Sequence, residues 1–178
     1  MRFGIVLLAT LDFALFGIAL RLVFARGGRT ARPTRLLVLI GSAFSCLHVF
    51  LLATAALEPI TVAAGAMLYT LAGGLFTWAA HSVRGRTFRL AYASNRPSWV
   101  FSGGPFRWLR HPFYLSYSLA WSAGVVALAD PRLVWTLVIM LAFYVGAAWR
   151  EEQQMLRGPA ANAYRAYRRQ AGVLLPRF

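Results

Sequence analysis

The chain has 178 residues, of which 59% are hydrophobic and 13% are charged. An ordinary soluble domain carries about twice that charged share, so the composition excludes this class. The net charge of +14 could suit nucleic acid, but arginines that flank apolar spans and face anionic lipid head groups explain it better. The single cysteine, Cys46, excludes an intrachain disulfide and a multi-cysteine metal site. We therefore expect an all-α integral membrane protein with anionic lipids as partners, no nucleic-acid partner and no metal ligands.

Five apolar segments have the ~20-residue length that a helix needs to cross a bilayer. We expect them to form a single polytopic domain, followed by a cytoplasmic C-terminal amphipathic helix. Residues 1–80 would be a three-helix part, and residues 81–178 would carry the site. The predicted spans are Phe3–Phe24, Leu36–Leu57, Ile60–Ala80, Pro112–Leu128 and Leu133–Trp149.

The arginines predict how the chain is oriented. All except Arg2 and Arg132 lie in the loop after the first span, in segment 81–111 or in the tail 150–178. Because positive residues mark the cytoplasmic side, the N-terminus should be outside and the C-terminus cytoplasmic, and an odd number of spans places the termini on opposite sides in this way. We expect a bacterial inner membrane, with any site for a polar ligand on the cytoplasmic side.

Two ionisable residues fall inside predicted spans. A charge at the centre of a membrane helix costs roughly 2.5–3.5 kcal/mol, so Asp12 needs a partner or a neutral form. By residue count, His48 in the second span lies at a similar depth. We therefore expect an Asp12–His48 hydrogen bond; alternatively, Asp12 lies in the outer third of the membrane and reaches water.

Glu151 and Glu152 follow the fifth span and are the only acidic residues on the arginine-rich side. They could simply neutralise arginines, although the C-terminal end of a helix favours cations. Adjacent residues point about 100° apart on a helix, so one glutamate can face the bundle interior while the other pairs with arginine. We favour a ligand-binding role.

The stretch Arg110–His111–Pro112 opens the fourth span, with Tyr114 on the same helix face as His111. Proline suits the first helical position, but neither residue before it is a standard cap. The positive helix end and the guanidinium therefore favour an anion. An ordinary interfacial arginine on a lipid phosphate is the simpler alternative.

Two further patterns flank these residues. The upstream stretch "SGGPF" indicates a tight turn, whose glycines allow a ligand to approach the backbone. Downstream, Gly158–Pro159 should end one helix and begin another, which places Tyr164 and Tyr167 on one face. Periodicity alone favours an interfacial amphipathic helix with tyrosines at head-group level; an aromatic lid over a flat ligand is the alternative.

Taken in order, these motifs resemble the isoprenylcysteine carboxyl methyltransferase family and its phospholipid methyltransferase relatives. The resemblance covers about 100–178, is loose over 81–99, and treats the first three spans only as hydrophobic helices. Two departures are Leu115–Ser116–Tyr117, where members often have glycine, and Arg157–Gly158, where Phe-Gly is common. The matching motifs are Gly104–Pro105–Phe106, Arg110–His111–Pro112 with Tyr114, Glu151–Glu152, the pair Tyr164 and Tyr167, and Pro176.

The resemblance implies an integral membrane enzyme that uses S-adenosylmethionine to methylate a lipophilic or amphiphilic acceptor. It implies catalytic roles for Arg110, His111 and Glu151. A membrane lipid or sterol-type reductase using NADPH, and a non-enzymatic lipid-binding protein, are the alternatives. The cofactor-binding residues that it implies are Gly104, Arg110, His111, Pro112, Tyr114, Glu151, Glu152, Tyr164 and Tyr167.

Overall fold

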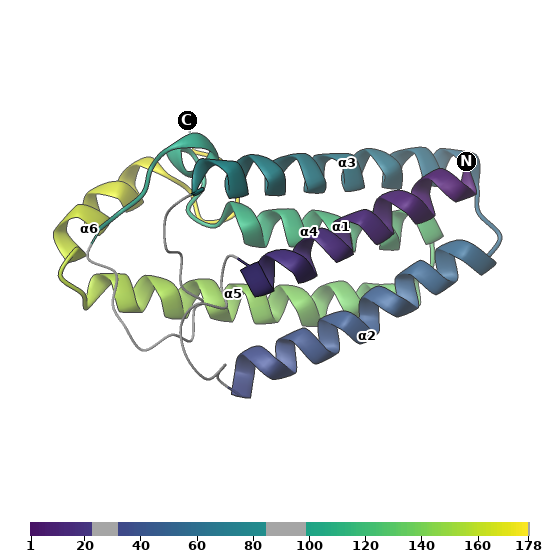
Figure 1. Cartoon of the computed structure of the whole chain (residues 1–178), viewed down its shortest axis with the longest axis horizontal. Helices are drawn as coiled ribbons and strands as arrows, with labels where there is room; N and C mark the ends of the chain where they lie inside the picture. Colours follow the sequence, from purple (N-terminus) through teal and green to yellow (C-terminus); the bar gives the residue numbers. More distant parts are fainter. Residues whose placement is uncertain (23–31, 85–98, 178) are drawn as a thin grey trace.

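The computed structural model describes residues 1–22, 32–84 and 99–177. These residues form helices and no β-strand, apart from an isolated parallel bridge between Leu109 and Gly172. In Figure 1, helices α1 to α5 run roughly along the long axis of the molecule, and the short helix α6 lies at one end. The helices are α1 (Arg2–Leu22), α2 (Arg32–Thr54), α3 (Pro59–Ser82), η1 (Gly104–Arg107), α4 (Pro112–Leu128), η2 (Pro131–Leu133), α5 (Val134–Leu156) and α6 (Ala161–Gln170).

Four of the described helices, α1, α2, α3 and α5, are long and apolar enough to cross a membrane. The described residues confirm the all-helical prediction. A helix suits a segment in lipid because it satisfies its own backbone hydrogen bonds internally. Helix α4 has 17 residues, or roughly 25 Å at 1.5 Å per residue, against a hydrocarbon core of about 30 Å. A fifth span therefore stays a prediction.

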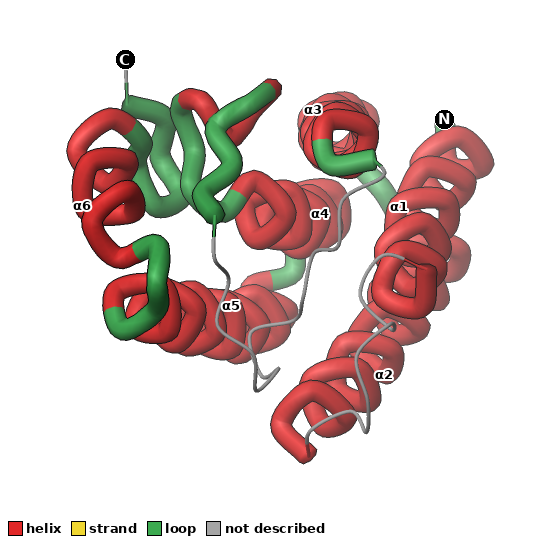
Figure 2. Tube along the Cα trace, turned by 60° about the vertical axis from the view of Figure 1, so that its left-hand side comes forward, coloured by secondary structure: helices red, strands yellow, loops and turns green. Residues whose placement is uncertain are grey.

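Helix α4 lies at the centre of the bundle. It contacts α1, α2, α3 and α5, and Figure 2 shows it between α3 and α5. Small residues allow α3 to approach it closely: a Cβ added to Gly65 would lie 2.5 Å from the Cβ of Ala127 and 2.9 Å from the carbonyl oxygen of Ala123. Close contact through small residues is how helices associate in lipid, where hydrophobic burial gives no advantage.

Aromatic rings fill the bundle beneath the start of α4. The ring centroids of Phe16 and Phe76 are 4.9 Å apart, those of Phe76 and Phe113 are 5.2 Å apart, and those of Phe16 and Tyr117 are 4.7 Å apart. These edge-on and tilted contacts join α1, α3 and α4. They give the polar end of the bundle a packed, apolar floor.

One end of the bundle gathers most of the polar chain. Segment 99–111, α6 and the C-terminal tail lie where α3 and α5 end and α4 begins, opposite the N-terminus (Figure 1). This arrangement agrees with the prediction that these segments share one side. Among the arginines on which that prediction rests, those at positions 26, 29, 86, 89 and 96 lie outside the described residues.

The predicted Asp12–His48 hydrogen bond is wrong. Nε2 of His48 is 2.8 Å from Oγ1 of Thr136 on α5. Its Nδ1 atom and Oδ2 of Asp12 are buried and have no hydrogen-bond partner among the described residues. Asp12 packs instead against α3, where a Cβ on Gly73 would lie 2.5 Å from its Oδ1.

Candidate functional site

The backbone at the start of α4 is held by the C-terminal tail. The amide of Arg110 donates to the carbonyl of Gly172 at 2.7 Å, and that of His111 donates to the carbonyl of Val173 at 3.2 Å. In return, the amide of Gly172 donates to the carbonyl of Trp108 at 3.0 Å. The tail thus positions the two side chains that the sequence singles out for an anion.

Helix α4 begins at Pro112, as predicted, and this proline is almost fully buried. Its ring fixes a helical backbone angle at a position that needs no amide donor. His111 is the residue before the helix, and its side chain makes no capping hydrogen bond. The imidazole is therefore free to turn towards α5.

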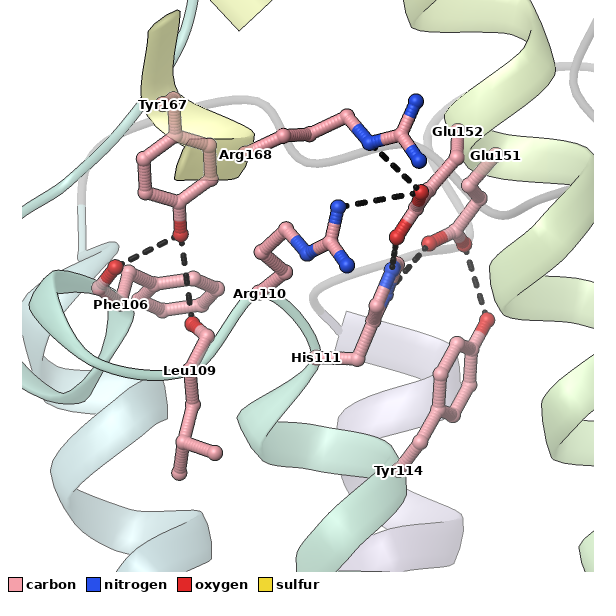
Figure 3. A network of polar contacts seen from close by, with 9 residues as sticks. All are labelled: Phe106, Leu109, Arg110, His111, Tyr114, Glu151, Glu152, Tyr167 and Arg168. Atoms are coloured by element: carbon pink, nitrogen blue, oxygen red, sulfur yellow. Dashed lines mark hydrogen bonds and ion pairs between the residues drawn. The ribbon is translucent and has the colours of Figure 1, made fainter. Parts of the chain in front are cut away.

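Both ring nitrogens of His111 face a glutamate of α5 (Figure 3). Nδ1 is 3.3 Å from Oε2 of Glu151, and Nε2 is 3.3 Å from Oε1 of Glu152. A carboxylate can only accept, so the arrangement requires a hydrogen on both nitrogens, which is the imidazolium form. His111 has no lone pair with which to take a proton while it is held in this way.

The pKa of His111 agrees with this geometry. Burial alone would lower it, but the hydrogen bonds to Glu151 and Glu152 and the charges of these carboxylates raise the pKa to about 8. The ring is therefore mainly cationic at neutral pH.

Glu152 binds two arginines as well as His111. Nη1 of Arg110 donates to its Oε2 at 3.2 Å, and Nε of Arg168 on α6 lies 3.4 Å from the same oxygen. The side chains of Arg110 and Glu152 are 8% and 10% exposed, so this ion pair is largely removed from water. The sequence analysis did not include Arg168 among the site residues. Its position directly after Tyr167 was the one hint that it lies near the site.

These ion pairs form one ionic network, whose positive and negative charges do not cancel. Its members are Arg110, His111, Glu151, Glu152 and Arg168. Three cationic groups face two carboxylates, which leaves an excess of one positive charge. Nε of Arg110 is buried and has no hydrogen-bond partner in the described part of the chain. A buried, unpartnered guanidinium nitrogen in a net positive network suits an anion.

Tyr114 links the network to a column of rings. Its hydroxyl donates to Oε1 of Glu151 at 2.8 Å. Its ring stacks between His111, at 5.5 Å and 20°, and Tyr144, at 5.6 Å and 13°. Trp121 donates to the hydroxyl of Tyr144 at 3.0 Å. The apolar periodicity of α5 gave no sign that Tyr144 would join this column.

The pair Tyr164 and Tyr167 lies inward from α6. Both rings are buried in a small cluster with Ala171, and their centroids are 6.0 Å apart. The hydroxyl of Tyr167 is 2.6 Å from the carbonyl oxygen of Phe106 and 3.2 Å from that of Leu109 (Figure 3). The pair fastens α6 to the segment that precedes α4.

Gly104 is needed for packing and lies apart from the ionic network. Its φ is +56°, in the left-handed region that favours glycine. A Cβ there would collide with Oγ of Ser82 and lie 3.4 Å from Nε1 of Trp78, both on α3. The tight turn predicted from "SGGPF" therefore packs directly against α3.

Five of the residues singled out by sequence do meet at one place: Arg110, His111, Tyr114, Glu151 and Glu152. No family model, curated protein or solved structure matches this chain. The activity and the cofactor suggested by the motif resemblance are therefore proposals.

Proposed function

We propose that this chain is an integral membrane enzyme that transfers a methyl group from S-adenosylmethionine to a lipophilic or amphiphilic acceptor at the cytoplasmic membrane interface. The observation that carries the proposal is the ionic network at the start of α4. Its excess positive charge and the unpartnered Nε of Arg110 suit a carboxylate. The motif resemblance narrows that carboxylate to the one on the cofactor.

The residues present fit the other groups of this cofactor. Glu151 is the more accessible carboxylate, with a side chain 29% exposed against 10% for Glu152. It suits the cationic part of the cofactor or its ribose hydroxyls.

Exposed tryptophans support the interfacial placement. Trp149 is 66% exposed and lies two residues before Glu151, and Trp78 is also exposed near the same end of the bundle. Trp135, at the opposite end of α5, is 70% exposed. Tryptophans favour the two membrane–water interfaces, so the ionic network would lie at head-group level with α6 on the cytoplasmic surface. Helix α4 would be the fifth, centrally enclosed span.

For methyl transfer, the main task of the protein is to position the acceptor in line with the methyl group of the cofactor. S-adenosylmethionine supplies the methyl group on a sulfonium, so the protein must bind, orient and exclude water. Arg110 and His111 would bind a negatively charged group of the cofactor. The backbone hydrogen bonds to the C-terminal tail position both residues. A carboxylate acceptor needs no base, whereas an amine must lose a proton, for which Glu151 is the accessible group.

The test is an assay of purified protein with methyl-labelled cofactor and a total membrane extract, followed by identification of the labelled lipid. We expect label in one lipid class, and loss of that label in Arg110→Gln. Absence of label in every fraction would contradict methyl transfer. Oxidation of NADPH by the purified protein in the presence of the same extract would favour the reductase alternative. If His111→Ala and Glu151→Ala both keep the activity of the unmodified protein in a cellular functional assay, a non-enzymatic role is favoured.

A further inference from the structure

Within the described part of the chain, three buried polar atoms in the middle of the bundle, away from the ionic network, have no hydrogen-bond partner. They are Oδ2 of Asp12 on α1, Nδ1 of His48 on α2 and the hydroxyl oxygen of Tyr69 on α3. Asp12 is 7% exposed, and the other two residues are fully buried. Buried polar atoms in native proteins are nearly always hydrogen-bonded, and the requirement is stricter where the surroundings are lipid. We therefore expect a bound molecule to supply the hydrogen bonds that these three atoms lack.

The hydrogen bonds of Thr136 fix the chemistry of His48. The Thr136 hydroxyl donates to the carbonyl of Leu133 at 2.7 Å. Its single hydrogen is then used, so its oxygen accepts from Nε2 of His48, 2.8 Å away. In the neutral ring, Nδ1 is then an acceptor that needs a donor.

The three atoms border the same part of the interior. A Cβ added to Gly124 on α4 would collide with Nδ1 of His48 and lie 3.1 Å from the Tyr69 hydroxyl. Asp12 packs on Gly73, one helical turn along α3 from Tyr69, and the ring of the adjacent Phe13 contacts both Tyr69 and Trp121. The side chains of Asp12, His48 and Tyr69 thus line neighbouring parts of the interior between α1, α2, α3 and α4.

We propose that internal water binds among these three side chains. It donates to Nδ1 of His48 and Oδ2 of Asp12, and it accepts from the hydroxyl of Tyr69. Buried waters make two to four such bonds, so the three partners suffice. A hard metal cation would need about six oxygen ligands, far more than one carboxyl and one hydroxyl provide.

Aromatic rings wall this site. The ring of His48 meets that of Trp121 edge-on at 5.2 Å, and the ring of Tyr69 meets that of Phe13 at 6.3 Å. The bound water joins α1, α2 and α3, and Thr136 extends the connection to α5. The water would thus add α1 and α3 to the polar connection that His48 and Thr136 already make between α2 and α5, a helix that carries the ionic network.

X-ray radiolytic labelling of the full-length protein in detergent, read by mass spectrometry, tests the proposal. Hydroxyl radicals form from water, so a fully buried side chain is labelled when bound water touches it. Phe76 is the internal reference, because it is equally buried on α3 but packs against Phe16 and Phe113. After correction for intrinsic reactivity, we expect labelling of Tyr69 to be several-fold faster than that of Phe76. Equal rates would overturn the proposal.

Variants separate bound water from opening of the bundle. His48→Phe keeps a ring beside Trp121 but removes Nδ1, so labelling of Tyr69 should fall towards the Phe76 rate. If this variant does not fold, Tyr69→Phe serves instead, with labelling of His48 as the readout. Thr70→Val is the matched control, because it removes an exposed α3 hydroxyl bonded only to its own helix. Labelling that persists at its original rate in the folded test variant would contradict the water site.

Discussion

His111 and Glu152 are 41 residues apart in the sequence, yet Nε2 of the histidine lies 3.3 Å from Oε1 of the glutamate. This contact fastens the start of α4 to the last turns of α5. Glu152 also binds Arg110 and Arg168, so one carboxylate contacts three cationic groups from two separate segments, the stretch before α4 and helix α6. The ionic network therefore depends on Glu152 more than on any other group in it.

We expect Glu152→Gln to lower the free energy of unfolding by about 3 kcal/mol, because removing one partner leaves buried charges uncompensated. The measurement is thermal unfolding in detergent. Glu151→Gln is the matched control: its side chain is more exposed, and the amide oxygen can still accept from Tyr114. A loss in Glu151→Gln as large as that in Glu152→Gln would show that the two carboxylates are equivalent.

The stability of the protein should depend on pH through His111. Its pKa is raised from 6.5 to about 8. A raised pKa contributes stability that is fully present below pH 6.5 and is lost as pH rises through about 8, a difference of roughly 2 kcal/mol. Unfolding midpoints measured from pH 6 to pH 9 should fall over that window. The decline should be absent in His111→Gln, and an equal decline in that variant would assign it to another group.

Gly104→Ala should destabilise the turn before α4 by about 1–3 kcal/mol, because its positive φ and its contact with Ser82 both exclude a Cβ. Gly74→Ala, on α3 with nothing within 4 Å of the added Cβ, should be neutral or slightly stabilising. Chemical unfolding in detergent compares the two variants. Equal stability would show that the turn relaxes without loss.

Orientation can be read in intact cells with a membrane-impermeant maleimide, after Cys46→Ser removes the only cysteine. Glu58→Cys lies in the turn between α2 and α3, and Asn162→Cys lies on the exposed face of α6. We expect labelling of the first and none of the second until the cells are permeabilised. The reverse pattern would invert the proposed topology.

Local signals predicted much of the fold. Pro112 starts α4, and Gly158–Pro159 separates α5 from α6, because proline and glycine act on the backbone at their own positions. The fifth predicted span stops at Trp149, where hydropathy falls, whereas helix α5 continues to Leu156, close to the break predicted at Gly158–Pro159. Helix hydrogen bonding does not end where apolar side chains do.

Contacts between distant segments were beyond the sequence. Spacing brought His111 and Tyr114 to one face, but nothing indicated that Gly172 and Val173 would pair with the backbone before α4. The similar depth of the two residues suggested a hydrogen bond between His48 and Asp12. The rotation of the helices about their axes instead directs the His48 ring towards Thr136, to which it is hydrogen-bonded. Residue count measures depth and leaves rotation undetermined.

Isothermal titration of the purified protein with S-adenosylhomocysteine, compared with NADPH, tests the central claim most directly. We predict saturable binding of the first compound and none of the second. Arg110→Gln should weaken that binding at least about tenfold, the equivalent of 1.4 kcal/mol. Arg165→Gln, which removes an exposed α6 arginine bonded to Asn162, should leave it unchanged. Absence of binding by S-adenosylhomocysteine, or saturable binding of NADPH in its place, would contradict the claim.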